Sequence, residues 1–324
     1  MRKLKVGIDD FKELRDEGGY FVDKSLLIRE VIEGSKCLLL PRPRRFGKTL
    51  NLSMLRYFFE KSDGDRRDLF DGLHITEDVG AMEHQGRYPV IFMSLKNIKG
   101  GDWTVAQDAI VEKIATLYKR HRYVADGLAE DDRDQFERLA TGKGGRADLN
   151  SSLANLITHL HSYHESPVVV LIDDYDTPIL RAWDHGYYGE MTEFMRDWLG
   201  AGLKHENGLA LYRAVVTGIL RVATASIFSG FNNLVTWPPL RGGPFTDKFG
   251  FTQPEVDQLL SDFGVPELAD PINEWYNGYD FGGRRSTIPG RWSVACSRVP
   301  PPSARTGSTP PPIRSFTKSL RQEG

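Results

Sequence analysis

Residues 37–50, CLLLPRPRRFGKTL, join an apolar run, a basic loop and a Gly-Lys-Thr triplet in direct succession. The apolar run has the length of a strand buried on both faces of a sheet, and apolar side chains recur at helical spacing over 49–61. Strand, loop and helix in this order are what a phosphate-binding loop (P-loop) of the pattern G-x-x-x-x-G-K-[ST] requires. Residues 47–49 supply the second half of that pattern, but Arg42 stands where its first glycine is expected. The alternative interpretation is a solvated basic loop that happens to precede a helix.

The residues of this loop suit the phosphates of a nucleotide. Lys48 can reach the β- and γ-phosphates, and the Thr49 hydroxyl can ligate Mg²⁺. Backbone N–H groups at the start of a helix form a nest for anions. The residues expected to bind ATP here are Arg44, Arg45, Phe46, Gly47, Lys48 and Thr49.

A second apolar run, VVVLIDD at 168–174, ends in two acids. A P-loop ATPase needs a strand that ends in an acid holding the magnesium, and a second acid that positions the attacking water. Asp173 is the predicted metal acid, together with Thr49, and Asp174 is the predicted catalytic acid. The alternative is a buried strand whose terminal acids face solvent. Because both motifs occur in strand context, the sequence predicts binding of ATP with Mg²⁺.

Apolar runs of strand length alternate with helical patterns through most of the chain. Such alternation indicates an α/β fold in which a mostly parallel sheet lies between two layers of helices. We therefore expect a three-layer P-loop NTPase fold over residues 1–245. Further strands are expected at 88–97 and 209–220, and further helices at 104–121, 151–164 and 191–204.

The pattern changes towards the C-terminus. Residues 252–264, with Pro254 near the start and Gly264 at the end, predict a short helix. We expect it to lie in a small helical, lid-like subdomain over 246–283. Residues 284–324 hold seven of the chain's 18 prolines and no periodic apolar pattern. Such a segment buries too little apolar surface to offset its ordering entropy, so we expect a disordered tail.

Composition and charge indicate a cytoplasmic protein. The N-terminus has no apolar run typical of a signal peptide, and no run is long enough to cross a membrane. Cys37 and Cys296 show neither metal-ligand spacing nor a disulfide framework. The net charge of −2 divides into +7 for 284–324 and −9 for 1–283. An acidic body argues against nucleic acid as a partner, because phosphate binding needs clustered cations.

Several segments together resemble the AAA-ATPase-like family, whose members usually carry a C-terminal domain of the PD-(D/E)XK nuclease superfamily. The resemblance runs in order through roughly residues 4–283. In that family the first position of the loop is commonly arginine, so the resemblance makes Arg42 a family trait. The segments that carry the resemblance are VGIDDFKELRDEGGYFVDKSLLI, PRPRRFGKTLNLSMLRYFFE, LIDDYDTPIL, VTGILRVATASIFSGFNNL, FGFTQPEV and EWYNGYDFGG.

The resemblance also implies further site residues. Arg221, after the strand at 209–220, matches the place of a sensor residue that touches the γ-phosphate; the alternative is a surface arginine. The segment from Tyr20 to Lys24 is expected near the adenine, with Asp23 and Lys24 as its binding residues. Where this chain has Asp174, the family usually has glutamate. The shorter carboxylate falls about 1.5 Å short, and a misplacement of that kind can cost about 10²-fold in rate, so weak or absent hydrolysis is expected.

The nuclease domain of the resembled family is not expected in this chain. A PD-(D/E)XK site needs clustered acids and a lysine, whereas residues 284–324 contain one acid, Glu323. In the family, the chain continues after YNGYDFGG with a stretch like Ile-Tyr-Asn-Pro-Trp-Ser-Val. Codons for that stretch, moved by one base, spell Ser-Thr-Ile-Pro-Gly-Arg-Trp, which stands at 286–292. This match favours a frameshift near residue 284.

The favoured function is an ATP-binding P-loop protein with weak or absent hydrolysis and no nuclease activity. Its expected ligands are ATP and Mg²⁺, and its possible partners are another protein or a second copy of the chain, with neither nucleic acid nor membrane. Two alternatives stay open: a non-catalytic, nucleotide-dependent switch that binds a protein partner, and a nonfunctional gene fragment.

Overall fold

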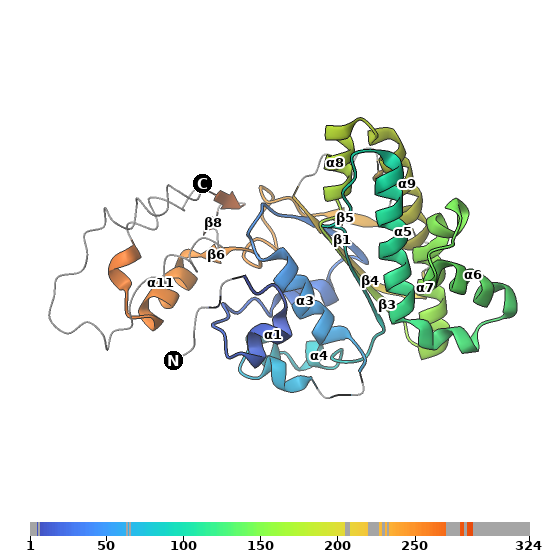
Figure 1. Ribbon diagram of the computed structural model, residues 1–324. Helices are drawn as coiled ribbons and strands as arrows, with labels where there is room; N and C mark the ends of the chain where they lie inside the picture. Colours follow the sequence, from blue (N-terminus) through green and yellow to red (C-terminus); the bar gives the residue numbers. More distant parts are fainter. Residues whose placement is uncertain are drawn as a thin grey trace.

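A five-stranded, all-parallel sheet lies at the centre of the computed structural model (Figure 1). The strand order is β2-β3-β4-β1-β5, so β4 lies between the strand that leads into the basic loop and the strand that ends in two acids. The strands are β1 (Cys37–Pro41), β2 (Val90–Ser94), β3 (Val168–Asp173), β4 (Leu211–Gly218) and β5 (Leu234–Thr236). The structure describes residues 5, 7–62, 64, 66–204, 208–219, 227–228, 231, 233–269, 279–281 and 284–287.

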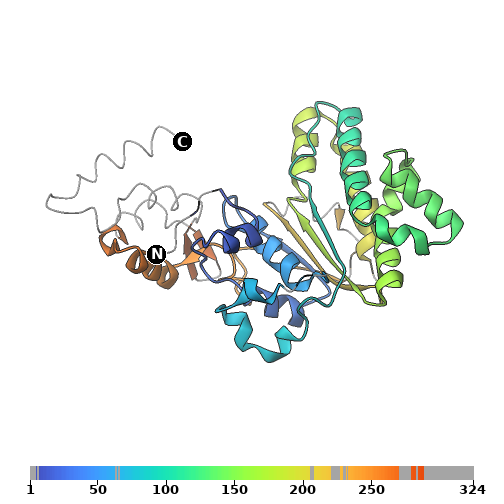
Figure 2. The same cartoon turned by 60° about the horizontal axis from the view of Figure 1, so that its bottom comes forward.

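Helices cover both faces of this sheet and complete the three layers that the sequence predicts (Figures 1 and 2). One face carries α1 (Phe11–Asp16), α2 (Leu27–Glu33), α3 (Lys48–Phe59) and α4 (Val79–Met82), with the short 3-10 turns η1 (Arg67–Phe70) and η2 (His74–Glu77). The other face carries α5 (Trp103–Arg120), α6 (Glu130–Ala140), α7 (Arg146–His164), α8 (Thr177–His185) and α9 (Tyr188–Leu203), with η3 (Arg122–Gly127). The expected strands and the four expected helices of this region are confirmed.

Alternate side chains of β1 enter the two cores. Leu38 and Leu40 pack with the helices α1 to α4, and Cys37 and Leu39 pack with the helices α5 to α9. All five residues of β1 are buried, and the strand pairs with β4 on one side and β5 on the other. Because parallel strands end at the same edge, the loop after β1 lies beside the ends of β3 and β4, and this edge of an α/β sheet is where ligands bind.

A second, smaller sheet comes after the parallel sheet in the chain. β6 (Phe251–Thr252), β8 (Arg284–Thr287) and β7 (Tyr279–Phe281) are antiparallel, in the order β6-β8-β7. α11 (Gln253–Asp262) follows β6 directly, and the 3-10 turn η5 (Pro266–Leu268) comes after it. We call β6, α11, η5, β7 and β8 together the C-terminal subdomain.

The C-terminal subdomain differs in part from the helical unit expected over 246–283. The predicted helix is confirmed as α11, which begins with a capping box between Thr252 and Glu255. Strands flank this helix, however, and residues 284–287, expected to begin a disordered tail, form the middle strand of the small sheet. The remainder of the expected tail, 288–324, lies outside the described residues.

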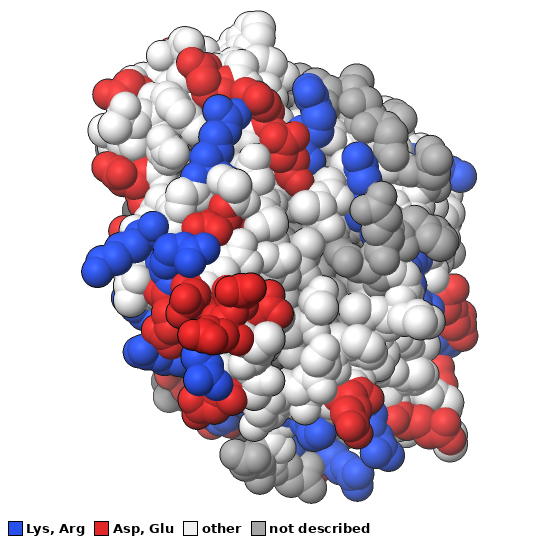
Figure 3. Space-filling model, turned by 90° about the vertical axis from the view of Figure 1, so that its right-hand side faces the viewer, with Lys and Arg blue, Asp and Glu red and all other residues white. Residues whose placement is uncertain are grey.

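The face of the molecule that lies on the right in Figure 1 carries a mixture of acidic and basic side chains (Figure 3). On this side, the first turn of α6 alone holds Glu130, Asp131 and Asp132. The described part of this face shows no continuous basic stripe of the kind that tracks a nucleic-acid backbone. Within the described residues, no helix has both the length and the apolar character needed to span a bilayer.

Candidate functional site

The loop between β1 and α3 turns sharply before the helix begins. Arg45 and Gly47 both have left-handed backbone conformations, with φ of 69° and 75°. Phe46 between them is only 1 % exposed and packs into the core below. The side chains of Arg44 and Arg45 are exposed and line the cleft above. Of the loop residues predicted to bind a ligand, Phe46 can therefore contribute only through its backbone.

Lys48 begins α3 and lies back over the loop. Its Nζ donates a hydrogen bond to the carbonyl of Pro43 over 3.2 Å. Burial lowers the pKa of Lys48, while the negative charges of Asp174 and Asp173 act in the opposite direction. The ammonium group therefore lies at the positive end of the α3 dipole and close to two carboxylates, where an anion with several charges would be stabilised.

Asp173, the last residue of β3, is held by two threonine hydroxyls. Oγ1 of Thr49 donates to its Oδ2 over 2.6 Å, and Oγ1 of Thr217 donates to its Oδ1 over 2.6 Å. The backbone N–H of Asp174 also donates to Oδ1, over 3.0 Å. Asp173 and Thr217 are fully buried, so the carboxylate is fixed in one orientation between α3 and β4.

Sequence reasoning identified Thr49 and Asp173 but missed Thr217. This threonine is the seventh residue of β4, and its parallel pairing with β1 places it opposite Leu40. A polar residue that directly follows the apolar run 214–216, near the end of the strand, is the signal that could have indicated it. Because β4 lies between β1 and β3 in the sheet, the Thr217 side chain reaches Asp173.

Asp174 lies directly after β3 with a left-handed backbone, φ 51°, and its side chain lines the cleft. Burial, and then the charge of Asp173, raise the pKa of the Asp174 carboxyl, while Lys48 lowers it. Lys96, in the loop that follows β2, also lines the cleft and favours the ionised form. The two predicted acids thus differ in role: one is bonded inside the protein, and the other faces the cleft.

The end of β4 is closely packed against the residues after β3. The backbone N–H of Ile219 donates to Oδ2 of Asp176 over 2.8 Å. A Cβ on Gly218 would come within 2.7 Å of both the Tyr175 ring and Asp176, so this position accepts only glycine without a shift of its neighbours. Arg221, the predicted sensor, lies outside the described residues.

A cleft of about 850 Å³ opens over the loop and extends to the C-terminal subdomain. Such a volume lies in the range of small-molecule and cofactor sites. The part over the loop includes Lys48, Thr49, Lys96 and Asp174, and we call it the charged end. The part beside the C-terminal subdomain carries apolar side chains together with Lys24, and we call it the apolar end. The apolar end is lined by Ile8, Leu14, Phe21, Val22, Phe251 and Leu259.

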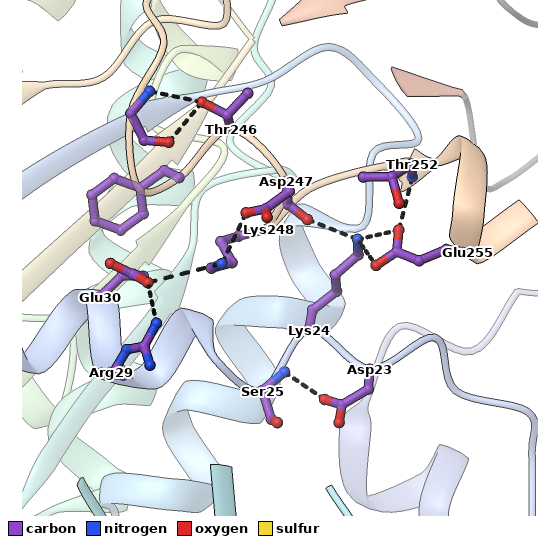
Figure 4. Close-up of polar contacts among 12 residues, drawn as sticks. Asp23, Lys24, Ser25, Arg29, Glu30, Thr246, Asp247, Lys248, Thr252 and Glu255 are labelled. Carbon is purple, nitrogen blue, oxygen red and sulfur yellow. Dashed lines mark hydrogen bonds and ion pairs between the residues drawn. The ribbon is translucent and has the colours of Figure 1, made fainter. Parts of the chain in front are cut away.

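The predicted adenine residues Asp23 and Lys24 separate in the structure. The Asp23 carboxylate accepts from the backbone N–H groups of Ser25 and His74, over 2.8 and 2.7 Å, and Asp23 is not among the residues that line the cleft. Lys24 lines the cleft, and its Nζ contacts both carboxylate oxygens of Glu255 at 2.6 Å (Figure 4). Burial lowers the pKa of Lys24, and Glu255 opposes that shift.

Thr49 and Asp173 are the residues at the charged end of the cleft that could hold a magnesium ion brought by a phosphate ligand. Mg²⁺ is held in such sites by one or two protein ligands, by phosphate oxygens and by water. The Thr49 hydroxyl and the Asp173 carboxylate, 2.6 Å apart, supply the hard oxygen donors that this ion prefers. No group of three or more His, Cys, Asp or Glu side chains within the described part of the chain could hold a metal ion by itself.

The fold and the site define a three-layer α/β protein with a charged cleft. The cleft lies where the junction between the loop and α3 approaches Asp173 and Asp174 at the end of β3. Residues 5–228 match the family described as "Predicted AAA-ATPase", and the chain belongs to this family. It is 31 % identical over 290 residues to a protein of Azotobacter chroococcum mcd 1, described as "Uncharacterized protein in vnfD 5'region". The match covers 87 % of this chain and 49 % of that relative, so the chain spans about half its length.

Proposed function

We propose that this chain binds ATP together with Mg²⁺ in the cleft over the loop. The observation that supports this most is the contact between Thr49 and Asp173, which lie 124 residues apart in the sequence and 2.6 Å apart in the structure. This contact lies at the N-terminus of α3, where Lys48 and the positive end of the helix dipole would stabilise a bound phosphate. Membership of a family described as an ATPase agrees with this ligand.

Each residue of the charged end has a place in this proposal. Lys48 would move from the Pro43 carbonyl to the β- and γ-phosphates, because phosphate oxygens carry more negative charge than a carbonyl oxygen. Thr49 and Asp173 would hold the magnesium, which neutralises charge on the phosphates when it is bound. The base and the ribose would lie towards the apolar end of the cleft, beside Val22, since apolar side chains such as Phe21 and Phe251 there can pack against a base.

We further propose that hydrolysis is slow. Asp174 would orient the attacking water; the observation that supports this role is that its side chain lines the cleft together with Lys48. Its side chain is one methylene shorter than a glutamate, and a displacement of about 1 Å can lower a rate about 10²-fold. The raised pKa of Asp174 makes it a better proton acceptor than an ordinary aspartate, which offsets part of that loss. A protein that binds ATP and turns it over slowly is suited to a nucleotide-dependent switch.

Titration with the fluorescent analogue mant-ATP, with and without Mg²⁺, tests the proposal. Lys48→Ala should weaken binding at least about tenfold, which corresponds to about 1.4 kcal/mol, because the cation at the phosphates is removed. Lys119→Ala, at the exposed end of α5, is the matched control and should bind as the unchanged chain does. Equal affinity of the two variants would contradict the site, and phosphate release from ATP separates a slow ATPase from a switch without turnover.

A further inference from the structure

Arg42 occupies the position of the first glycine of the loop pattern, yet its side chain points away from the cleft. It is 2 % exposed, and its partners lie in the interior below the loop. Nη1 donates to the carbonyls of Pro41 and Trp237 over 2.8 and 2.7 Å, and Nη2 donates to the carbonyl of Phe245 over 2.9 Å. The guanidinium also lies over the ring of Phe249, 5.0 Å from its centroid. The side chain therefore does not obstruct the approach of a ligand to the loop.

The guanidinium of Arg42 is a buried charge, and its bonding partners hold the side chain in one position. Burial lowers the pKa of Arg42 to about 10, so the side chain stays protonated at neutral pH. Three carbonyl oxygens and one aromatic face stabilise the cation where water does not reach it. Each of these partners must stay in place, because an unpaired buried charge is strongly destabilising. Arg42 is thus a rigid link between the start of the loop and residues 237–249.

Residues 245–250, called the connector here, lead from this link directly into β6. Besides Arg42, three groups hold the connector. Nδ2 of Asn51, in α3, donates to the Lys248 carbonyl over 2.8 Å, and the backbone N–H of Gly250 donates to the Phe46 carbonyl over 3.2 Å. The third group is Nζ of Lys24, which donates to the Asp247 carbonyl over 2.7 Å. The loop is therefore bonded to the connector at both of its ends, through Arg42 and Phe46.

Lys24 links the connector to the C-terminal subdomain, because its ammonium group contacts both Asp247 and Glu255 (Figure 4). Lys24 contacts Glu255, which caps α11, and Glu255 also accepts from the backbone N–H of Thr252 over 2.7 Å. Lys248 lies near Asp247 at 2.8 Å and near Glu30 of α2 at 3.8 Å. Hydrogen bonds of 2.6–2.9 Å therefore run from Arg42 to the connector, from the connector to Lys24, and from Lys24 to Glu255 at the start of α11.

We propose that Arg42 is a positioning residue, which sets the shape of the loop through the connector and couples its occupancy to the C-terminal subdomain. The inference rests on the proposed binding of ATP. A glycine at this position would restore the usual loop pattern, but it would remove three hydrogen bonds and the contact with Phe249. Arg42→Gly therefore weakens nucleotide binding, although the motif alone would predict an improvement.

The test compares Arg42→Gly and Arg42→Lys with a matched control at the other end of the sheet. Arg213, in β4, also donates to three carbonyls, those of Val31, Tyr212 and Ile32, and stacks on Tyr212 at 4.6 Å. Arg213→Ala loses the same kinds of contact far from the loop. Arg42→Lys retains the cation and part of its bonding, so a folded variant is available if Arg42→Gly does not fold.

Two measurements are made on the full chain: mant-ATP affinity with Mg²⁺, and hydrogen exchange of 253–262 with and without saturating ATP. In the unchanged chain and in Arg213→Ala, ATP should slow exchange in this helix. Both Arg42 variants should bind mant-ATP about tenfold more weakly or worse, and saturating ATP should no longer slow exchange there. Unchanged or tighter binding by an Arg42 variant, or exchange that still responds to ATP, would overturn the inference. Failure of the unchanged chain to bind mant-ATP would instead contradict the proposed function.

Discussion

Replacing Thr217 by valine removes one hydroxyl and leaves the shape of the side chain nearly unchanged. Oγ1 of Thr217 donates to Oδ1 of Asp173 over 2.6 Å, and both residues are fully buried. After the substitution, the carboxylate keeps Thr49 and the backbone N–H of Asp174 as partners but loses its hydroxyl on the side of β4. The carboxylate then has one hydrogen bond fewer, and its orientation is held less firmly.

The expected loss of stability follows from the type of bond. A hydrogen bond to a charged group contributes about 1.5–3 kcal/mol. A loss of about 2 kcal/mol lowers the Tm of a domain of this size by about 4–8 °C. Because Thr217 orients the proposed metal acid, the Mg²⁺ concentration needed for half-maximal mant-ATP binding should rise by about 10–100-fold, as is typical when the partner of a metal ligand is removed.

Thermal melts and Mg²⁺ titrations of two variants measure both effects. Thr236→Val, in β5, is the control, because it makes the same chemical change at a hydroxyl that has no hydrogen-bond partner among the described residues. A double variant with Thr49→Val measures whether the two hydroxyls act on the same carboxylate, since their effects should then not be additive. If Thr217→Val and Thr236→Val melt at the same temperature and need the same Mg²⁺, the reasoning is wrong.

Three further predictions concern Asp174 and the small sheet. Asp174→Glu should raise the rate of phosphate release if the short side chain limits hydrolysis; an equal or lower rate would contradict this. Asp174→Asn should raise the Tm at neutral pH, because a carboxyl whose pKa is raised in the fold destabilises it when ionised. The difference should vanish as acid protonates Asp174, and a constant difference in melts across that range would refute it. A chain ending at residue 283 should melt below one ending at Thr287, because β8 pairs with both β6 and β7; equal melting would show that β8 does not stabilise the subdomain.

The parts of the site that follow from local sequence were predictable. β1, the loop and α3 form one continuous segment, and the apolar run before Asp173 identifies β3 as a buried strand. These patterns reflect burial on both faces of the sheet, which depends on composition over a few residues. They also place Thr49 and Asp173 at the same edge, because both follow strands of one parallel sheet.

The contacts that depend on neighbouring elements were not predictable. Thr217 contacts Asp173 because β4 lies between β1 and β3, and the order of strands in the sheet cannot be inferred from the sequence of a single strand. The direction of the Arg42 side chain depends on the carbonyls of Trp237 and Phe245, which lie about two hundred residues further along the chain. Likewise, Asp23 is held by the backbone of His74, which the adenine expectation did not consider. In each case the deciding partner is distant in sequence.

The position of β4 between β1 and β3 also sets the distance between the loop after β1 and the acids at the end of β3. Neighbouring strands lie about 4.8 Å apart, so the loop after β1 and the acids after β3 are separated by two spacings, about 9.6 Å. Backbone hydrogen bonds along three strands maintain this separation, and no side-chain substitution can narrow it. The length of the side chains at this edge can still vary. Under the proposed function, the distance from the carboxylate at 174 to the phosphates would change in steps of one methylene group, and aspartate is one such step shorter than glutamate.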